Sequence, residues 1–245
     1  MSATPSYPSY RKNAVVAGIL FIICTAVSVL SIAPIDGLLS GPGWLTGLAS
    51  HGGRVFGSAL LDFAWAASSA GIAIALYPAL RKHNRAFALG AVAGRVLEGA
   101  LVLVASLVLL ALLNVSKGAG AAGAAGAGSF DAAATSLLAV RDWSLSIVAV
   151  LCFAAGAFMY YAVLYKARIV PRWLSGWGLV GVALSLGVTV YCGFIQEFGF
   201  STLNSALNIP IGVQEMVMAV WLIAKGFRAP VAAGYRVAHV APAAA

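Results

Sequence analysis

Six runs of about twenty or more mostly apolar residues dominate the sequence. They cover residues 13–33, 57–80, 86–113, 140–165, 174–195 and 203–224. A helix needs about 20 apolar residues to cross the roughly 30 Å hydrocarbon core of a bilayer. Only helices and closed barrels satisfy their backbone hydrogen bonds in lipid, and these runs lack the alternation of barrel strands. The sequence therefore predicts an all-α integral membrane bundle of six transmembrane helices over residues 13–227.

The composition supports a membrane protein and argues against a soluble one. Hydrophobic residues make up 62% of the chain and charged residues only 9%, whereas soluble domains carry about 25% charged residues. The net charge of +8 comes from short clusters beside the apolar runs, so we expect contact with the lipid bilayer and no nucleic-acid partner. The first run is longer than the apolar part of a signal peptide, which predicts an uncleaved anchor.

Lysine and arginine are distributed unequally between the two sets of loops. The loops on one side of the predicted bundle hold only Arg54, Lys117 and Arg141. The loops and terminal segments on the other side hold Arg11, Lys12, Arg81, Lys82, Arg85, Lys166, Arg168, Arg172, Lys225, Arg228 and Arg236. Basic loops stay in the cytoplasm, so both termini are predicted to be cytoplasmic. Residues 1–12 then form a cytoplasmic segment and residues 228–245 a disordered tail. The Gly/Ala-rich stretch 118–128 is predicted to be a flexible outer loop.

Four charged residues lie well inside the predicted spans, away from their ends: Asp62, Arg95, Glu98 and Glu215. Each costs about 2.5–3.5 kcal/mol at a helix centre on insertion scales, so each needs a partner, water or a function. A rise of 1.5 Å per residue places all four about 8–16 Å below the outer edge of the hydrocarbon. They are therefore predicted to form one layer in the outer half of the bilayer.

Further polar residues point to the same region. Arg141 and Asp142 begin the fourth span at the rim, and Asn208 shares a helical face with Glu215. Arg95 and Glu98 are three residues apart and can pair. The layer holds more acids than bases, and an unpaired carboxylate in a low dielectric favours its protonated form. The sequence thus allows two interpretations: a polar binding pocket, or charges that pair off to hold the helices together.

Several chemistries are not supported by the residues present. None of the three histidines lies in a predicted span, so no haem or metal site and no cofactor is predicted. Cys24, Cys152 and Cys192 lack metal-ligand or redox spacing, which favours a packing role. No catalytic residue can be assigned, and whether the chain is an enzyme stays open.

Four short motifs together resemble a bacterial membrane family known as domain of unknown function 4386. They are Arg95-x-x-Glu98, Arg141-Asp142-Trp143, the segment 171–178, and the segment that runs from Gln214-Glu215-Met216 to Lys225-Gly226-Phe227. The resemblance covers about residues 13–227, and the stretch 118–128 departs from the family pattern. It implies a six-pass protein of the inner membrane and no established activity.

Three functions remain open at this point. The first is the binding or transport of a small polar or cationic solute, or of a proton, in a pocket of Asp62, Arg95, Glu98, Arg141, Asp142, Asn208 and Glu215. The second is a non-catalytic partner or scaffold for another membrane protein, with the charges serving helix packing. The third is an intramembrane enzyme that acts on a lipid, because carboxylates alone can perform acid–base chemistry.

Overall fold

A computed structural model describes residues 10–126, 128–199 and 201–228, and every regular element in these ranges is helical. Six helical segments are long and apolar enough to cross a membrane: Arg11–Ile32, Trp44–Leu80, Arg85–Gly123, Gly128–Ala167, Arg172–Ile195 and Thr202–Ala224. The predicted all-α bundle with six membrane-spanning helices is therefore confirmed. The predicted terminal segments 1–12 and 228–245 lie outside the described residues, apart from 10–12 and Arg228.

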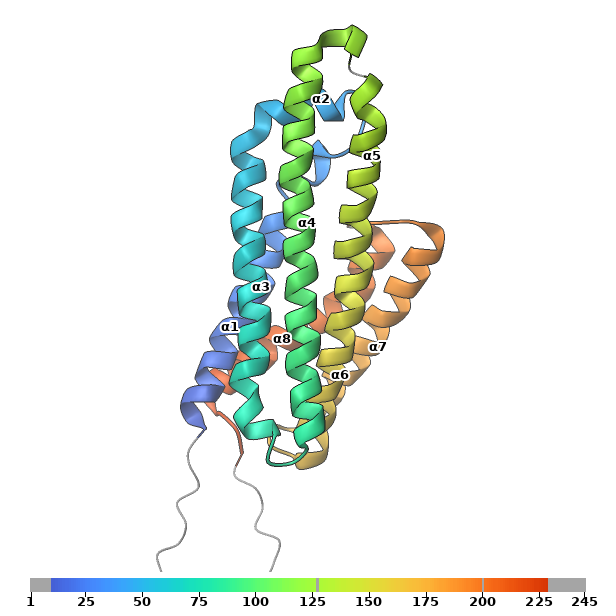
Figure 1. Cartoon of the computed structure of the whole chain (residues 1–245). Coiled ribbons are helices and arrows are strands. Elements are labelled where there is room, and N and C mark those ends of the chain that lie inside the picture. The colour runs from blue at the N-terminus through green and yellow to red at the C-terminus, as the bar shows by residue number, and fades with distance from the viewer. Residues whose placement is uncertain (1–9, 127, 200, 229–245) are drawn as a thin grey trace, which may run out of the picture.

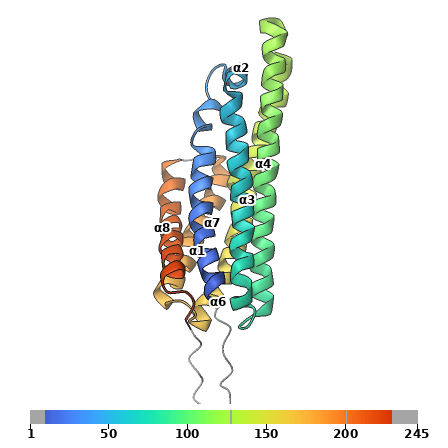
Figure 2. The same cartoon turned by 90° about the vertical axis from the view of Figure 1, so that its left-hand side faces the viewer.

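The spanning helices form a closed ring in chain order (Figures 1 and 2). The ring consists of α1 (Arg11–Ile32), α3 (Gly52–Leu80), α4 (Arg85–Gly126), α6 (Ala149–Ala167), α7 (Arg172–Ile195) and α8 (Thr202–Ala224). Each packs against the next, and α8 returns to pack against α1. Every spanning helix therefore turns one face toward a shared interior.

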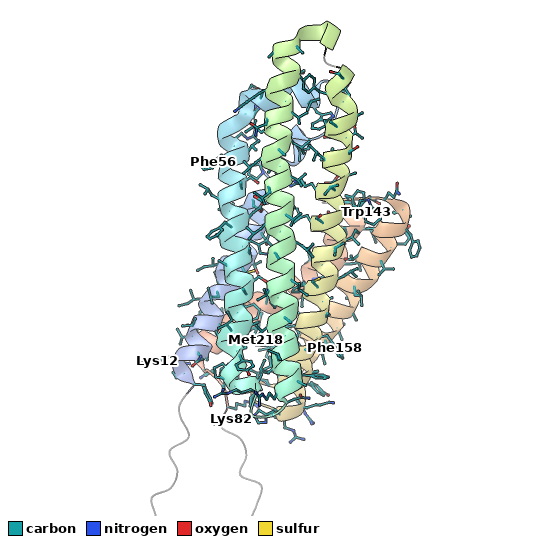
Figure 3. All side chains as sticks on the ribbon, in the orientation of Figure 1. Lys12, Phe56, Lys82, Trp143, Phe158 and Met218 are labelled. Carbon is teal, nitrogen blue, oxygen red and sulfur yellow. The ribbon has the colours of Figure 1, made fainter. Side chains whose placement is uncertain are left out.

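Basic side chains gather at one end of the bundle, here termed the basic end. Lys12 and Lys82 lie there (Figure 3). The Arg11 guanidinium donates to the carbonyl oxygens of Leu222 and Ile223 at 3.2 and 2.5 Å, which joins the start of α1 to the end of α8. Helices that leave this end alternate in direction, so the connections between them also alternate between the basic end and the opposite far end.

The far end carries a small apolar core of its own. The short helices η1 (Asp36–Leu38), α2 (Trp44–Leu48) and η2 (Ala49–His51) lie beside the upper parts of α4 and α5 (Gly128–Asp142). Side chains at this end form a cluster of Ile35, Leu39, Leu45, Leu48, Val55, Leu109, Leu112, Leu113, Ala119 and Ala134. In both views α4 and α5 project well beyond α7 and α8 (Figures 1 and 2).

Residues 118–126, most of the stretch predicted to be a flexible outer loop, are helical. Helix α4 continues through it to Gly126, interrupted at Gly123, where φ is 65°. Alanine is the best helix former, and each glycine costs only about 1 kcal/mol relative to it. The helix also packs there, because Ala119 is buried in the far-end core and Gly118 contacts the Phe130 ring of α5. Packing against α5 thus extends a helix that composition alone predicts to end.

Two glycines bring α4 and α6 into close contact. The spacing of Gly90 and Gly94 predicts a close helix neighbour in a membrane, and the structure confirms it. A Cβ atom at Gly94 would lie 2.7 Å from the Cα atom of Gly156, and one at Gly90 would collide with Met159. This close approach places Arg95, the residue after Gly94, against α6 and toward the shared interior.

Candidate functional site

Two joined cavities occupy the interior of the ring. The lower cavity, of about 260 Å³, is lined by Arg95, Glu98, Ser185 and Glu215 among others. The upper cavity, of about 720 Å³, lies toward the far end. Both share the lining residues Thr25, Ser28, Val29, Trp65, Leu145, Val150, Asn208 and Gly212. All six spanning segments contribute to these walls, so the ring surrounds one continuous space whose lining is largely apolar and carries a few charged and polar side chains.

Arg95 and Glu98 form a buried ion pair in the lower cavity. Arg95 is only 1% exposed, and its Nη1 lies 3.0 Å from Glu98 Oε2. Glu98 Oε2 also accepts a hydrogen bond from Ser69 Oγ at 2.8 Å. The guanidinium further contacts the Ser69 carbonyl oxygen, the Cys24 sulfur at 3.7 Å and the Phe153 ring. A buried charge is tolerated when it is paired and hydrogen-bonded, and this pair meets both conditions.

Glu215 differs from Glu98 because half of its carboxylate lacks a hydrogen-bond donor. Oε2 accepts a hydrogen bond from Thr25 Oγ1 at 3.3 Å, which joins α8 to α1. Oε1 is buried and has no hydrogen-bond partner among the described residues. Ser185 Oγ, in the wall of the same cavity, also lacks a partner there. Two residues that line the lower cavity thus each carry a buried polar atom with unused hydrogen-bonding capacity.

Arg141 and Asp142 lie at the upper cavity, where the fourth spanning segment changes its helical geometry. The Arg141 Nη1 atom is 3.4 Å from Asp142 Oδ1. The next six residues, Trp143–Val148, form a π-helix (η3) between α5 and α6. Leu145 and Ser146 of this π-helix line the upper cavity. π-helical turns occur frequently at functional sites, and this one contributes side chains to the cavity wall.

Asp62 lines neither cavity. Its carboxylate lies among the hydroxyl groups of Ser31 and Ser106 and in the field of Arg141. Ser69, seven residues further along α3, contacts Glu98, so Asp62 is about 10 Å nearer the far end than the Arg95–Glu98 pair. The single layer predicted for the four charges is therefore two levels. The reason is that α3 begins at Gly52, five residues before the predicted span, and this start lies beyond the far ends of α7 and α8 (Figures 1 and 2).

Asn208 lines both cavities, and part of its amide is used within α8. Its Nδ2 atom donates to the backbone oxygen and to Oδ1 of Asn204, at 2.9 and 2.7 Å. Asn204 in turn donates to the Gly199 carbonyl oxygen at 2.8 Å. These bonds order the first turns of α8 beside the upper cavity. The asparagines therefore contribute to helix stability as well as to the cavity wall.

A tyrosine pair closes the lower cavity toward the basic end. Tyr160 and Tyr161 are fully buried, with ring centroids 4.4 Å apart, and Phe21 packs edge-on against Tyr160. Tyr161 Oη donates to Gln214 Oε1 at 2.5 Å, and Gln214 Nε2 donates to the Leu174 carbonyl oxygen at 3.0 Å. We term these tyrosines with Phe21 and Gln214 the aromatic floor. The interior is thus sealed on this side.

The sequence pointed to most of the charged residues but not to much of the cavity wall. The sequence did not predict that Thr25, Ser28, Trp65, Ser185 and Thr189 line the cavities. It also did not predict the aromatic floor, which lines neither cavity and packs toward the basic end. The i, i+3 spacing of Thr25 and Ser28 and the i, i+4 spacing of Ser185 and Thr189 are faint signals of polar helix faces. Small hydroxyl residues are common in membrane helices, however, so these signals do not stand out. Across the described ranges no group of three or more His, Cys, Asp or Glu side chains could hold a metal ion.

The fold and the cavities define a multi-pass membrane protein with a charged interior. Residues 16–226 match the pattern of DUF4386, a domain of unknown function. The chain therefore belongs to this family, as the sequence motifs predicted. Comparison with curated proteins and with solved structures finds no match in either set.

Proposed function

We propose that this protein binds a positively charged solute in the lower cavity, with Glu215 as its counter-charge. The observation that carries the proposal is Glu215, which lines the lower cavity and whose buried Oε1 atom has no hydrogen-bond partner among the described residues. Arg95 is engaged by Glu98, Ser69 and Cys24. The lower cavity therefore holds two carboxylates against one guanidinium, and a cation or a proton balances the remaining charge.

The position of the cavity supports uptake from the outer face of a bacterial inner membrane. Basic loops remain in the cytoplasm, which assigns the basic end to the cytoplasm and the far end to the outside. The upper cavity lies toward the far end, where Ser40 and Gly199 contribute to its wall. The aromatic floor closes the opposite side. Binding of the solute from outside is thus the first step, and transport requires this floor to open.

The binding proposal is tested by the melting temperature of the purified protein in lipid nanodiscs. The probes are ethylammonium, choline and butane-1,4-diammonium, each compared with sodium chloride of equal ionic strength. A ligand that binds only the folded state raises the melting temperature. We expect at least one probe to stabilise the wild-type protein and Glu215→Gln to remove the effect, because the substituted amide keeps the shape and the Thr25 contact but has no charge.

A second variant tests the cavity without changing a charge. A Cβ atom at Gly212 meets nothing within 4 Å, and Gly212 lines both cavities. Gly212→Leu should therefore fill the space and abolish the stabilisation. Gly187→Leu is the matched control, because Gly187 also has open space around it but lies on the exposed side of α7. Equal responses of wild type, Glu215→Gln and Gly212→Leu to every probe would refute the proposal.

The ion pair itself has a second candidate role, which is to hold α3 and α4 together. Arg95 and Glu98 are satisfied by each other and by Ser69 of α3. This observation favours a packing function for these two residues, as expected for a scaffold or partner subunit. It does not apply to Glu215, whose Oε1 atom no described side chain satisfies.

A further inference from the structure

The residues that line the upper cavity indicate a side opening between α1 and α8. These two helices pack against each other and lie side by side on the face turned to the viewer in Figure 2. Three residues line the upper cavity and are also about half exposed: Val29 of α1 at 50%, and Ile209 and Val213 of α8 at 61% and 47%. A residue that both lines a cavity and faces the surroundings marks its mouth. All three side chains are apolar, as expected where a cavity opens to lipid, whereas Ser40, which is also exposed and lines the upper cavity, lies toward the far end.

The opening follows from the way in which α1 and α8 contact each other. Near the basic end the helices touch, because a Cβ atom at Gly18 would lie 2.7 Å from the Ala219 carbonyl oxygen. Further up, their side chains meet through the Thr25–Glu215 hydrogen bond of 3.3 Å. Beyond that bond, Val29 of α1 and Ile209 and Val213 of α8 all line the upper cavity. Glu215 therefore lies at the closed end of the opening.

The chemistry along the opening changes from ionic to apolar over a short distance. Glu215 and Ser185 lie at its inner end, and the Ser185 hydroxyl has no hydrogen-bond partner among the described residues. Val213 and Ile209 lie at its outer edge. Glu215 and Ile209 are six residues apart on α8, a rise of about 9 Å. A ligand that satisfies the whole path carries a cationic head and an apolar chain longer than this distance.

We propose that the ligand is a cationic amphiphile, a long-chain amine, that reaches Glu215 from the lipid between α1 and α8. This inference rests on the proposed function, because it takes Glu215 as the counter-charge. It adds the route and the chemical class. The ammonium head pairs with Glu215 Oε1 and donates to the Ser185 hydroxyl, while the chain leaves past Val213 and Ile209 into the outer half of the bilayer. A purely hydrophilic cation leaves the apolar mouth unused.

The test is photo-crosslinking in liposomes with dodecylammonium that carries a diazirine in the middle of its chain. The matched neutral probe is dodecanol with the same diazirine. Labelled peptides are identified by mass spectrometry. We expect the amine to label α8 around residues 209–213 and α1 around Val29, and Glu215→Gln to lower this labelling at least about tenfold. The alcohol should label wild type and Glu215→Gln alike.

A pair of tryptophan variants tests the route itself. Val213→Trp should narrow the mouth and lower amine labelling at Val29, whereas Val220→Trp should not. Val220 is a suitable control because it is an exposed valine of the same helix and lies outside both cavities. Circular dichroism and melting curves establish that each variant is folded before labelling is compared.

The results separate this inference from the proposed function. Amine labelling that does not depend on Glu215 or on Val213 would overturn the inference, because the chain would then insert as an ordinary lipid. A second outcome is that ethylammonium, choline or butane-1,4-diammonium stabilises the protein in a Glu215-dependent way while the labelling does not depend on Glu215. This outcome would overturn the amphiphile proposal and support the proposed solute site. Loss of Glu215 dependence in both assays would overturn both.

Discussion

Replacing Arg95 tests whether the buried ion pair stabilises the bundle. Arg95→Met keeps an unbranched side chain in the same space but leaves the Glu98 carboxylate without its cation. Two unit charges 3.0 Å apart attract by about 5.5 kcal/mol at an effective dielectric of about 20. Removing one partner of a buried pair costs about 3–5 kcal/mol, because the other charge stays desolvated. We expect Arg95→Met to lower the free energy of unfolding by this amount.

The companion variants separate pairing from simple loss of a side chain. Glu98→Gln likewise leaves the buried Arg95 guanidinium without its carboxylate, but the amide oxygen can still accept hydrogen bonds from Arg95 and Ser69, so we expect a loss at the lower end of this range, about 3 kcal/mol. The double variant Arg95→Met/Glu98→Gln leaves neither charge buried. Its free energy of unfolding should fall by at least about 2 kcal/mol less than the sum of the two single decreases, as expected for residues in direct contact.

The assay is unfolding by sodium dodecyl sulfate of protein reconstituted in mild detergent, followed by circular dichroism. Arg85→Met is the control, because Arg85 is an exposed arginine at the start of the same helix. Exposed substitutions usually change stability by less than about 0.5 kcal/mol. The reasoning is refuted if Arg95→Met is as stable as Arg85→Met, or if the two single losses simply add.

Two further variants test packing away from the charges. Gly94→Ala should destabilise the bundle by about 1–3 kcal/mol, because its Cβ atom would press on the Gly156 backbone of α6. Gly57→Ala is the control, because a Cβ atom there meets open space and should not destabilise the bundle. Comparable melting temperatures of the two variants would contradict this prediction. Tyr161→Phe should cost about 1–3 kcal/mol because it leaves the buried Gln214 Oε1 without its donor, and unchanged unfolding in sodium dodecyl sulfate would show that the aromatic floor does not depend on this bond.

The family relationship adds architecture to these arguments but no chemistry. The match to DUF4386 covers residues 16–226, and therefore includes both the ion pair and Glu215. The family match does not describe the cavity or its side opening. Both are features of the way in which the helices are arranged, as are the buried polar atoms that have no partner among the described residues. The amphiphile and the solute site are accordingly distinguished by binding and labelling experiments on this chain.

The sequence by itself determined the six helices and their membrane character. Long apolar runs are a local property, because a helix in lipid satisfies its own backbone hydrogen bonds and needs no partner to form. The sequence also identified the pairing of Arg95 with Glu98, since residues three apart on a helix share a face. It marked Gly94 as a contact point for a neighbouring helix.

Only the tertiary structure decided which charges meet and where the interior opens. Asp62 and Glu215 have similar predicted depths, yet Asp62 contacts serines of other helices and lines neither cavity, while Glu215 faces the lower cavity. The unequal lengths of the helices underlie this difference, because α3 and α4 extend past α7 and α8 and pack there in the far-end core. The side opening between α1 and α8 depends on where these two helices are held together. They are joined at the basic end by contacts between residues far apart in sequence, such as Arg11 with Leu222. Such contacts have no signature in local spacing, since they arise from how rigid helices of unequal length pack together.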